Sequence, residues 1–166
     1  VVNGYTHDGH VAVDNFTFQV VQTSSNDSTP VVAKFSVWDV NNSGGISGTS
    51  TPSSNIDVNS ITIKTPPTDG TVTDVTDLCT IDTVTDGANV DVYIADLKVG
   101  YSVNFDALNK TVGFEAVELI NAGGETITPD DGDGDITFAA GTYGNFDLGG
   151  FGYEIVNEGS QIDLSF

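Results

Sequence analysis

Apolar and polar residues alternate along most of the chain, in short runs separated by glycine, proline, asparagine and aspartate. Alternation with a period of two is typical of a β-strand that has one buried face. In the clearest run, Val31, Ala33, Phe35 and Val37 share one face, and Lys34 lies on the other. The pattern therefore predicts a chain built from half-buried strands.

Similar runs recur through the sequence, with Thr and Val enriched as expected for strands. The first run changes phase between Val13 and Phe16, which predicts a β-bulge near Asp14 and Asn15. About nine or ten strands, with a turn every ~8 to 15 residues, predict an all-β fold, an antiparallel β-sandwich that is Ig-like or jelly-roll-like. We expect one domain over residues 1–166. The further strands are predicted at 11–22, 60–65, 70–76, 89–96, 101–105, 135–140, 150–156 and 161–166.

Two regions depart from this pattern. Residues 114–124 contain good helix formers followed by Gly-Gly, which predicts a strand leading into one short helical turn. Residues 39–59 form the longest stretch without a strand pattern. A loop of that length in a compact domain is usually functional.

The charge of the chain restricts its partners. Four lysines and no arginine accompany 24 acidic residues, for a formal charge of -20. Contacts to phosphate require Lys and Arg, so we expect no nucleic acid, and an anionic membrane surface is disfavoured. Such a chain repels itself, which predicts divalent cations or a saline exterior. Of the 24 acids 19 are Asp, the shorter carboxylate favoured in turns and calcium loops.

Other features of the composition point to an extracellular or cell-surface location. No methionine occurs, which predicts a processed or excised piece. No apolar stretch is long enough for membrane insertion. The lone Cys79 shares a strand face with Val75 and Ile81, which predicts a small buried hydrophobe, with an intermolecular bridge or a reactive thiol as alternatives. His7 and His10 are the only histidines and are expected to be solvated.

A partial calcium loop follows the strand that ends at Trp38. In EF-hand order, Asp39, Asn41 and Ser43 occupy positions 1, 3 and 5, and Gly45 offers its carbonyl at position 7. Ser50 stands at position 12, where the EF-hand has a bidentate Glu. The segment is thus either half of a Ca²⁺ site, completed by a carboxylate from elsewhere, or a hairpin loop made of turn formers.

A second acidic segment contains Asp130, Asp131, Asp133 and Asp135 within six residues. Carboxylates this close repel each other unless they are spread into water or neutralised. Solvation and a bound Ca²⁺ are the two interpretations. The sequence does not choose among the carboxylates that would complete a shell, which are Asp69, Asp74, Asp77, Asp82 and Asp86.

Aromatic residues are candidates for carbohydrate binding, because their faces stack on sugar rings, although core packing is their usual role in strands. The candidates are Trp38, Tyr143, Phe146, Phe151 and Tyr153.

Two segments carry a family resemblance. Residues 55–73, "NIDVNSITIKTPPTDGTVT", and residues 15–20, "NFTFQV", resemble bacterial extracellular cadherin-like and VCBS-type surface repeats, although their order is inverted relative to one such repeat. The resemblance implies an extracellular β-sandwich.

These features predict a non-catalytic structural subunit or repeat of an extracellular filament or adhesin, stabilised by Ca²⁺. Its partners would be copies of itself or neighbouring repeats, and glycans are further candidates. The segments 1–5 and 161–166 are strand-like, so polymerisation by strand complementation is one route. The alternative is a Ca²⁺-dependent carbohydrate-binding module. An enzyme is not expected, since no nucleophile motif and no arginine clamp occur.

Overall fold

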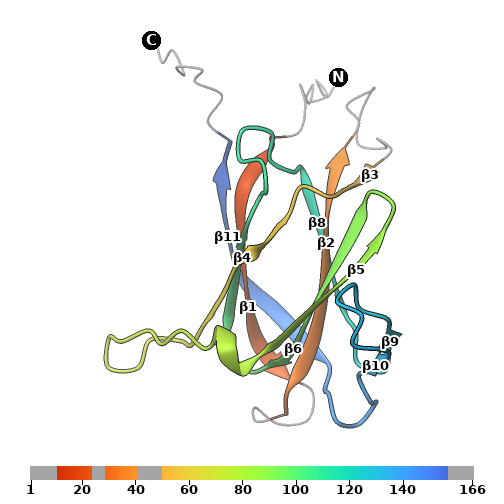
Figure 1. The fold of residues 1–166 in the computed structure, drawn as a ribbon. Helices are drawn as coiled ribbons and strands as arrows, with labels where there is room; N and C mark the ends of the chain where they lie inside the picture. The colour runs from red at the N-terminus through yellow and green to blue at the C-terminus, as the bar shows by residue number, and fades with distance from the viewer. Residues whose placement is uncertain (1–10, 24–28, 41–49, 157–166) are drawn as a thin grey trace, which may run out of the picture.

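The computed structural model describes residues 11–23, 29–40 and 50–156, and strands dominate these residues (Figure 1). Eleven strands and one short 3₁₀ turn occur in the described part of the chain. All the strand pairs are antiparallel, which confirms the predicted all-β sandwich with one or two strands more than expected. The elements are β1 (Val13–Thr23), β2 (Val31–Val40), β3 (Ser50–Ser53), β4 (Asp57–Lys64), η1 (Thr76–Leu78), β5 (Thr80–Asp86), β6 (Asn89–Leu97), β7 (Ser102–Asp106), β8 (Ala116–Asn121), β9 (Thr126–Ile127), β10 (Ile136–Thr137) and β11 (Phe146–Ile155).

The strands form two main sheets. The first has the order β11-β1-β7-β4, so β11 lies at one edge. The second is centred on β2, which pairs with β8 along one side and with β6 and then β3 along the other. Strand β5 lies outside β6. Among the described strands β8 therefore has β2 as its one neighbour and β11 has β1, so each sheet ends on this side in a strand with one free edge.

The main core lies between the two sheets. The predicted inner face of β2 is confirmed, because Val31, Ala33, Phe35 and Val37 are each at most 1% exposed. Their partners from the first sheet include Phe18 and other fully buried residues of β1, β4 and β7. Large aromatic rings fill the centre of this core.

A smaller cluster lies on the other face of the second sheet, where the β9–β10 hairpin covers β2 and β6 (Figure 1). Phe138 stacks on Tyr93 of β6 with a ring distance of 5.9 Å. Val32 and Ile127 are buried beside them. This cluster holds the hairpin, and with it the acidic segment between β9 and β10, against the sheet.

Two predictions about the course of the first strands can be checked. The β-bulge is confirmed, because the pairing of β1 with β11 shifts register between Val13 and Asn15. The prediction of a long loop at 39–59 is wrong in part, because β3 pairs with the end of β2 and β4 begins at Asp57.

Two other predictions need correction, the first of them only in part. The strand predicted within 114–124 is confirmed as β8, but no helical turn follows it among the described residues. Pairing with β2 places Val117 and Leu119 on alternate positions, partly buried against the core. Residues 70–76 do not form a strand, and isolated bridges at Thr71 and Asp74 replace it. The chain there has just turned through Asp69 and Gly70, both at positive φ, and then enters η1.

Candidate functional site

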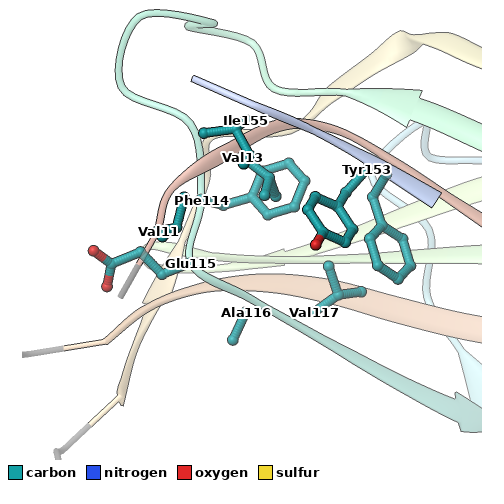
Figure 2. A pocket seen from close by; sticks show the side chains of 9 residues that line it. Val11, Val13, Phe114, Glu115, Ala116, Val117, Tyr153 and Ile155 are labelled. Atoms are coloured by element: carbon teal, nitrogen blue, oxygen red, sulfur yellow. The ribbon is translucent and has the colours of Figure 1, made fainter. Parts of the chain in front are cut away.

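An apolar groove opens on the side of the sandwich where the two free edges face each other (Figure 2). Its volume is about 280 Å³. One wall is the start of β8, represented by Ala116 and Val117, and the other is the end of β11, with Tyr153 and Ile155. Phe114 lies between them, and β1 closes the groove from behind. The lining is thus almost entirely hydrocarbon.

The groove exists because the first sheet extends past the second. Tyr153 of β11 pairs with Phe16 of β1, whose ring packs on the core, so Tyr153 points toward the second sheet. Phe151 and Ile155 alternate with Tyr153 and share its face. These three side chains are 60%, 64% and 56% exposed for Phe151, Tyr153 and Ile155, respectively. The inward face of a strand in a sandwich stays exposed when no strand of the other sheet lies opposite it. Opposite β11, the missing strand would lie beside β8.

The groove is continuous with the core through aromatic contacts. The ring of Phe16, which lines the groove, lies 6.1 Å from Phe151 beside the groove and 5.8 Å from Phe105 in the core. Phe105 lies 5.7 Å from Phe114 and 4.6 Å from Phe35. A ligand in this groove would therefore extend the existing hydrophobic core.

The carboxylate in the groove lining, Glu115, is already engaged. The backbone N–H of Val40 donates to Glu115 Oε2 at 2.7 Å, and the N–H of Glu115 donates to the carbonyl of Trp38 at 2.9 Å. These bonds set the start of β8 against the end of β2. The carboxylate thus positions a wall of the groove and leaves its interior apolar.

The acidic segment between β9 and β10 is attached to β5 by Asp130. Thr85 donates to this carboxylate twice, from its N–H at 3.0 Å and from its hydroxyl at 2.7 Å. The N–H of Asp130 donates to the carbonyl of Thr83 at 2.9 Å. The bonds from Thr85 hold the pKa of Asp130 below its ordinary value.

The other three acids of this segment take part in two hydrogen bonds within the loop. Asp135 accepts a hydrogen bond of 2.6 Å from the hydroxyl of Thr128. Asp131 accepts one of 3.1 Å from the N–H of Asp133. Asp131 and Asp133 are exposed and flank Gly132, which has a positive φ of 82°. All four predicted acids thus stay together in one loop.

A fifth carboxylate lies beneath this loop. Asp82 of β5 pairs with Tyr93, on the sheet face that the hairpin covers, and is 8% exposed. Its Oδ2 is buried and has no hydrogen-bond partner. Burial, together with repulsion from Asp131 and Asp133, raises the pKa of Asp82. The sequence placed Asp82 among five equivalent candidates, and no pattern in it marked this residue as the buried one.

The other predicted metal site falls mostly outside the described residues. Asp39 lies at the exposed end of β2, where its carbonyl accepts a hydrogen bond of 3.4 Å from the hydroxyl of Thr51. Asn41, Ser43 and Gly45 belong to residues that the structure does not describe. Within the described ranges no set of three or more His, Cys, Asp or Glu side chains is already arranged around a metal position. Ca²⁺ binding stays a prediction.

The five predicted sugar-binding aromatics are not brought together. Trp38 is half-buried and donates its indole N–H to Ser36 Oγ at 3.1 Å. Tyr143 is half-buried edge-on against Phe138, and Phe146 packs on the main core. Phe151 and Tyr153 alone among the five are exposed on one face of β11; Tyr153 lines the apolar groove and Phe151 lies next to it.

Cys79 lies at the end of η1 and not in a strand as predicted, but it is half-buried and packs against the main core. Burial, with the nearby charge of Asp96, raises the pKa of the thiol to about 11. The thiol is therefore protonated at neutral pH, which argues against a reactive role. His7 and His10 lie outside the described residues.

No family model, curated protein or solved structure matches this chain. A helix with the length and apolarity needed to cross a membrane does not occur among the described residues.

Proposed function

We propose that this chain is a non-catalytic structural subunit of an extracellular assembly, and that copies of it associate through the apolar groove between β8 and β11. The observation that carries the proposal is the exposed inward face of β11, formed by Phe151, Tyr153 and Ile155. Soluble monomers rarely leave such a contiguous patch uncovered, and an apolar patch beside a free strand edge is a recognition surface. The occupant that suits both features is a β-strand from a second copy, which hydrogen-bonds to β8 while its side chains fill the groove.

The chemistry of the groove favours this occupant over a sugar or a reacting substrate. Sugar sites need polar groups that fix the hydroxyls, in addition to an aromatic face. The titratable side chains that line the groove are Glu115, which is engaged with Val40, and Tyr153. Neither a pair of carboxylates nor a nucleophile with its base lies in the lining. Binding of an extended apolar segment needs neither polar groups that fix hydroxyls nor catalytic side chains.

Charging the groove tests the proposal. Tyr153→Asp and Ile155→Asp each place a carboxylate on an exposed position, so the fold should survive, while insertion of an apolar strand would bury an unpaired charge. We expect self-association to weaken at least about tenfold, equivalent to ~1.4 kcal/mol. Sedimentation velocity and electron microscopy measure the assembly, and circular dichroism monitors the fold.

Leu78→Asp is the matched control, because Leu78 is 70% exposed on η1, which is not part of the groove. This variant should assemble like the unmodified chain. Normal assembly of both groove variants would refute the proposed function.

We also propose that Ca²⁺ binds between Asp82 and the loop that carries Asp131 and Asp133. What supports this is the buried Oδ2 of Asp82, which lacks a partner beneath two exposed carboxylates. Ca²⁺ takes six to eight oxygen ligands at about 2.3–2.6 Å, so the loop has to close further onto Asp82 to complete a shell. The cation would neutralise a charge cluster in a chain of formal charge -20.

Adding Ca²⁺ should therefore raise the melting temperature relative to EDTA. At about 100 times the Kd the stabilisation is ~2.7 kcal/mol, or roughly 5–10 °C for a chain of this size. Asp82→Asn should remove most of this increase. Asp86→Asn, an exposed position on the same strand, should retain it. Equal responses of the two variants in scanning calorimetry would contradict the site.

The sign of the pH effect follows from the raised pKa of Asp82. The folded state holds this proton more tightly than the unfolded chain does, so without divalent ions Asp82 costs stability as pH rises above the unfolded pKa of about 3.9. In EDTA, Asp82→Asn should consequently show a smaller loss of stability with rising pH than Asp86→Asn.

A further inference from the structure

We infer that the strand that fills the groove is the C-terminal segment 161–166 of a second copy, inserted antiparallel to β8. This inference rests on the proposed function and names the occupant of the same groove.

The sequence of the segment matches what the groove lacks. In "QIDLSF", Ile162, Leu164 and Phe166 alternate with polar residues, so an extended chain places all three on one face. Alternate residues of a strand are about 6.6–6.8 Å apart. The exposed apolar residues of β11, Phe151, Tyr153 and Ile155, have the same alternate spacing. The three apolar side chains of the segment can thus cover the three exposed apolar side chains of β11.

The N-terminal segment is a poorer match. Of residues 1–8, one alternate set is Val1, Asn3, Tyr5 and His7. The other set begins with Val2 and continues through glycine, threonine and aspartate. Neither set places three apolar residues in succession on one face, so this segment would leave part of the groove uncovered.

The direction of the strands favours a second copy over the chain's own C-terminus. Val13 pairs with Ile155 and bridges Phe114, so β11 ends where β8 is about to begin. A segment that turns directly from Ile155 into its own groove would run parallel to β8. Every strand pair in the described sheets is antiparallel, and parallel pairing is slightly less stable per residue. The segment of another copy can enter from the opposite end and pair antiparallel.

This mode of insertion has a consequence for the assembly. Residues 156–160, "VNEGS", separate β11 from the inserted segment and reach at most about 18 Å when extended. Neighbouring copies would therefore sit close together. Because the segment and the groove are different surfaces, the contact is heterologous, and it generates an open filament unless its rotation closes a ring.

The test uses the chain without residues 161–166 and a fluorescein-labelled peptide of residues 157–166. We expect the shortened chain to be folded and monomeric by sedimentation velocity. It should bind the peptide saturably in fluorescence anisotropy. The Leu164→Asp peptide should bind at least tenfold more weakly, as should the unmodified peptide to the shortened Tyr153→Asp protein. An Asp163→Asn peptide, changed on the polar face, should bind like the unmodified one.

The outcomes separate this inference from the proposed function. If the shortened chain assembles normally while Tyr153→Asp does not, another segment fills the groove and only the inference fails. If both assemble normally, the groove is not the contact and the proposed function fails as well. A full chain that is monomeric, and whose melting temperature falls when 161–166 is removed, would indicate insertion into its own groove and overturn the inference.

Discussion

The Phe35→Ala variant is expected to lose about 3–5 kcal/mol of unfolding free energy, the usual cost of removing a buried phenylalanine ring. Phe35 is 1% exposed and stacks on Phe105 at a ring distance of 4.6 Å. Phe18 meets it edge-on at 5.8 Å. Deleting the ring leaves a cavity where both sheets meet, and strands paired on each side cannot close it easily.

Urea denaturation of the monomer measures this loss as a lower midpoint with an unchanged slope. Phe151→Ala is the control with the same chemistry, because Phe151 is 60% exposed on β11. In the monomer it should cost less than about 1 kcal/mol. Similar losses for the two variants would mean that Phe35 is not at the centre of the core.

Gly113→Ala is expected to cost more than about 2 kcal/mol and to weaken assembly. Gly113 has a φ of 68°, where a Cβ is strained, and an added Cβ would lie 2.5 Å from the carbonyl oxygen of Val13 and from Val156 Cγ2. The carbonyl belongs to a strand backbone and cannot yield as a side-chain end would. Since Phe114 follows directly, the shift should also disturb the groove.

Gly87→Ala isolates the clash from the backbone strain. Gly87 has a similar φ of 63°, but an added Cβ there has no atom within 4 Å. It should cost only the strain, about 1–2 kcal/mol. The unfolding free energies come from the same denaturation experiment, and equal losses at the two glycines would show that close packing around Gly113 plays no part.

Local pattern was sufficient to predict the strands that bury one face completely. The alternation in β2 predicted its inner face at Val31, Ala33, Phe35 and Val37. The phase change in β1 predicted the bulge next to Asn15. Both succeed because the side-chain period of a strand is a property of its own backbone.

The same reasoning failed where neighbours decide the outcome. Residues 114–124 fit a helical and a strand pattern equally, and pairing with β2 selected the strand. Residues 70–76 alternate well, yet they follow a turn that reverses at Gly70 and have no strand partner over most of their length. Strand propensity is realised only when a partner edge is present.

Site residues show the same division. Asp130, Asp131, Asp133 and Asp135 were recognisable because they are close in sequence. Asp82 lies far from them along the chain, and its burial depends on how the β9–β10 hairpin lies on β5.

The sequence by itself determined that this protein is all-β and strongly acidic, because backbone period and net charge are local or additive properties. Only the tertiary structure decided that β11 extends past the opposing sheet and leaves Phe151, Tyr153 and Ile155 uncovered. Their alternation is the same as in any buried strand. Whether an inward face is covered depends on how many strands the opposite sheet supplies, and that number is set by pairing between distant segments.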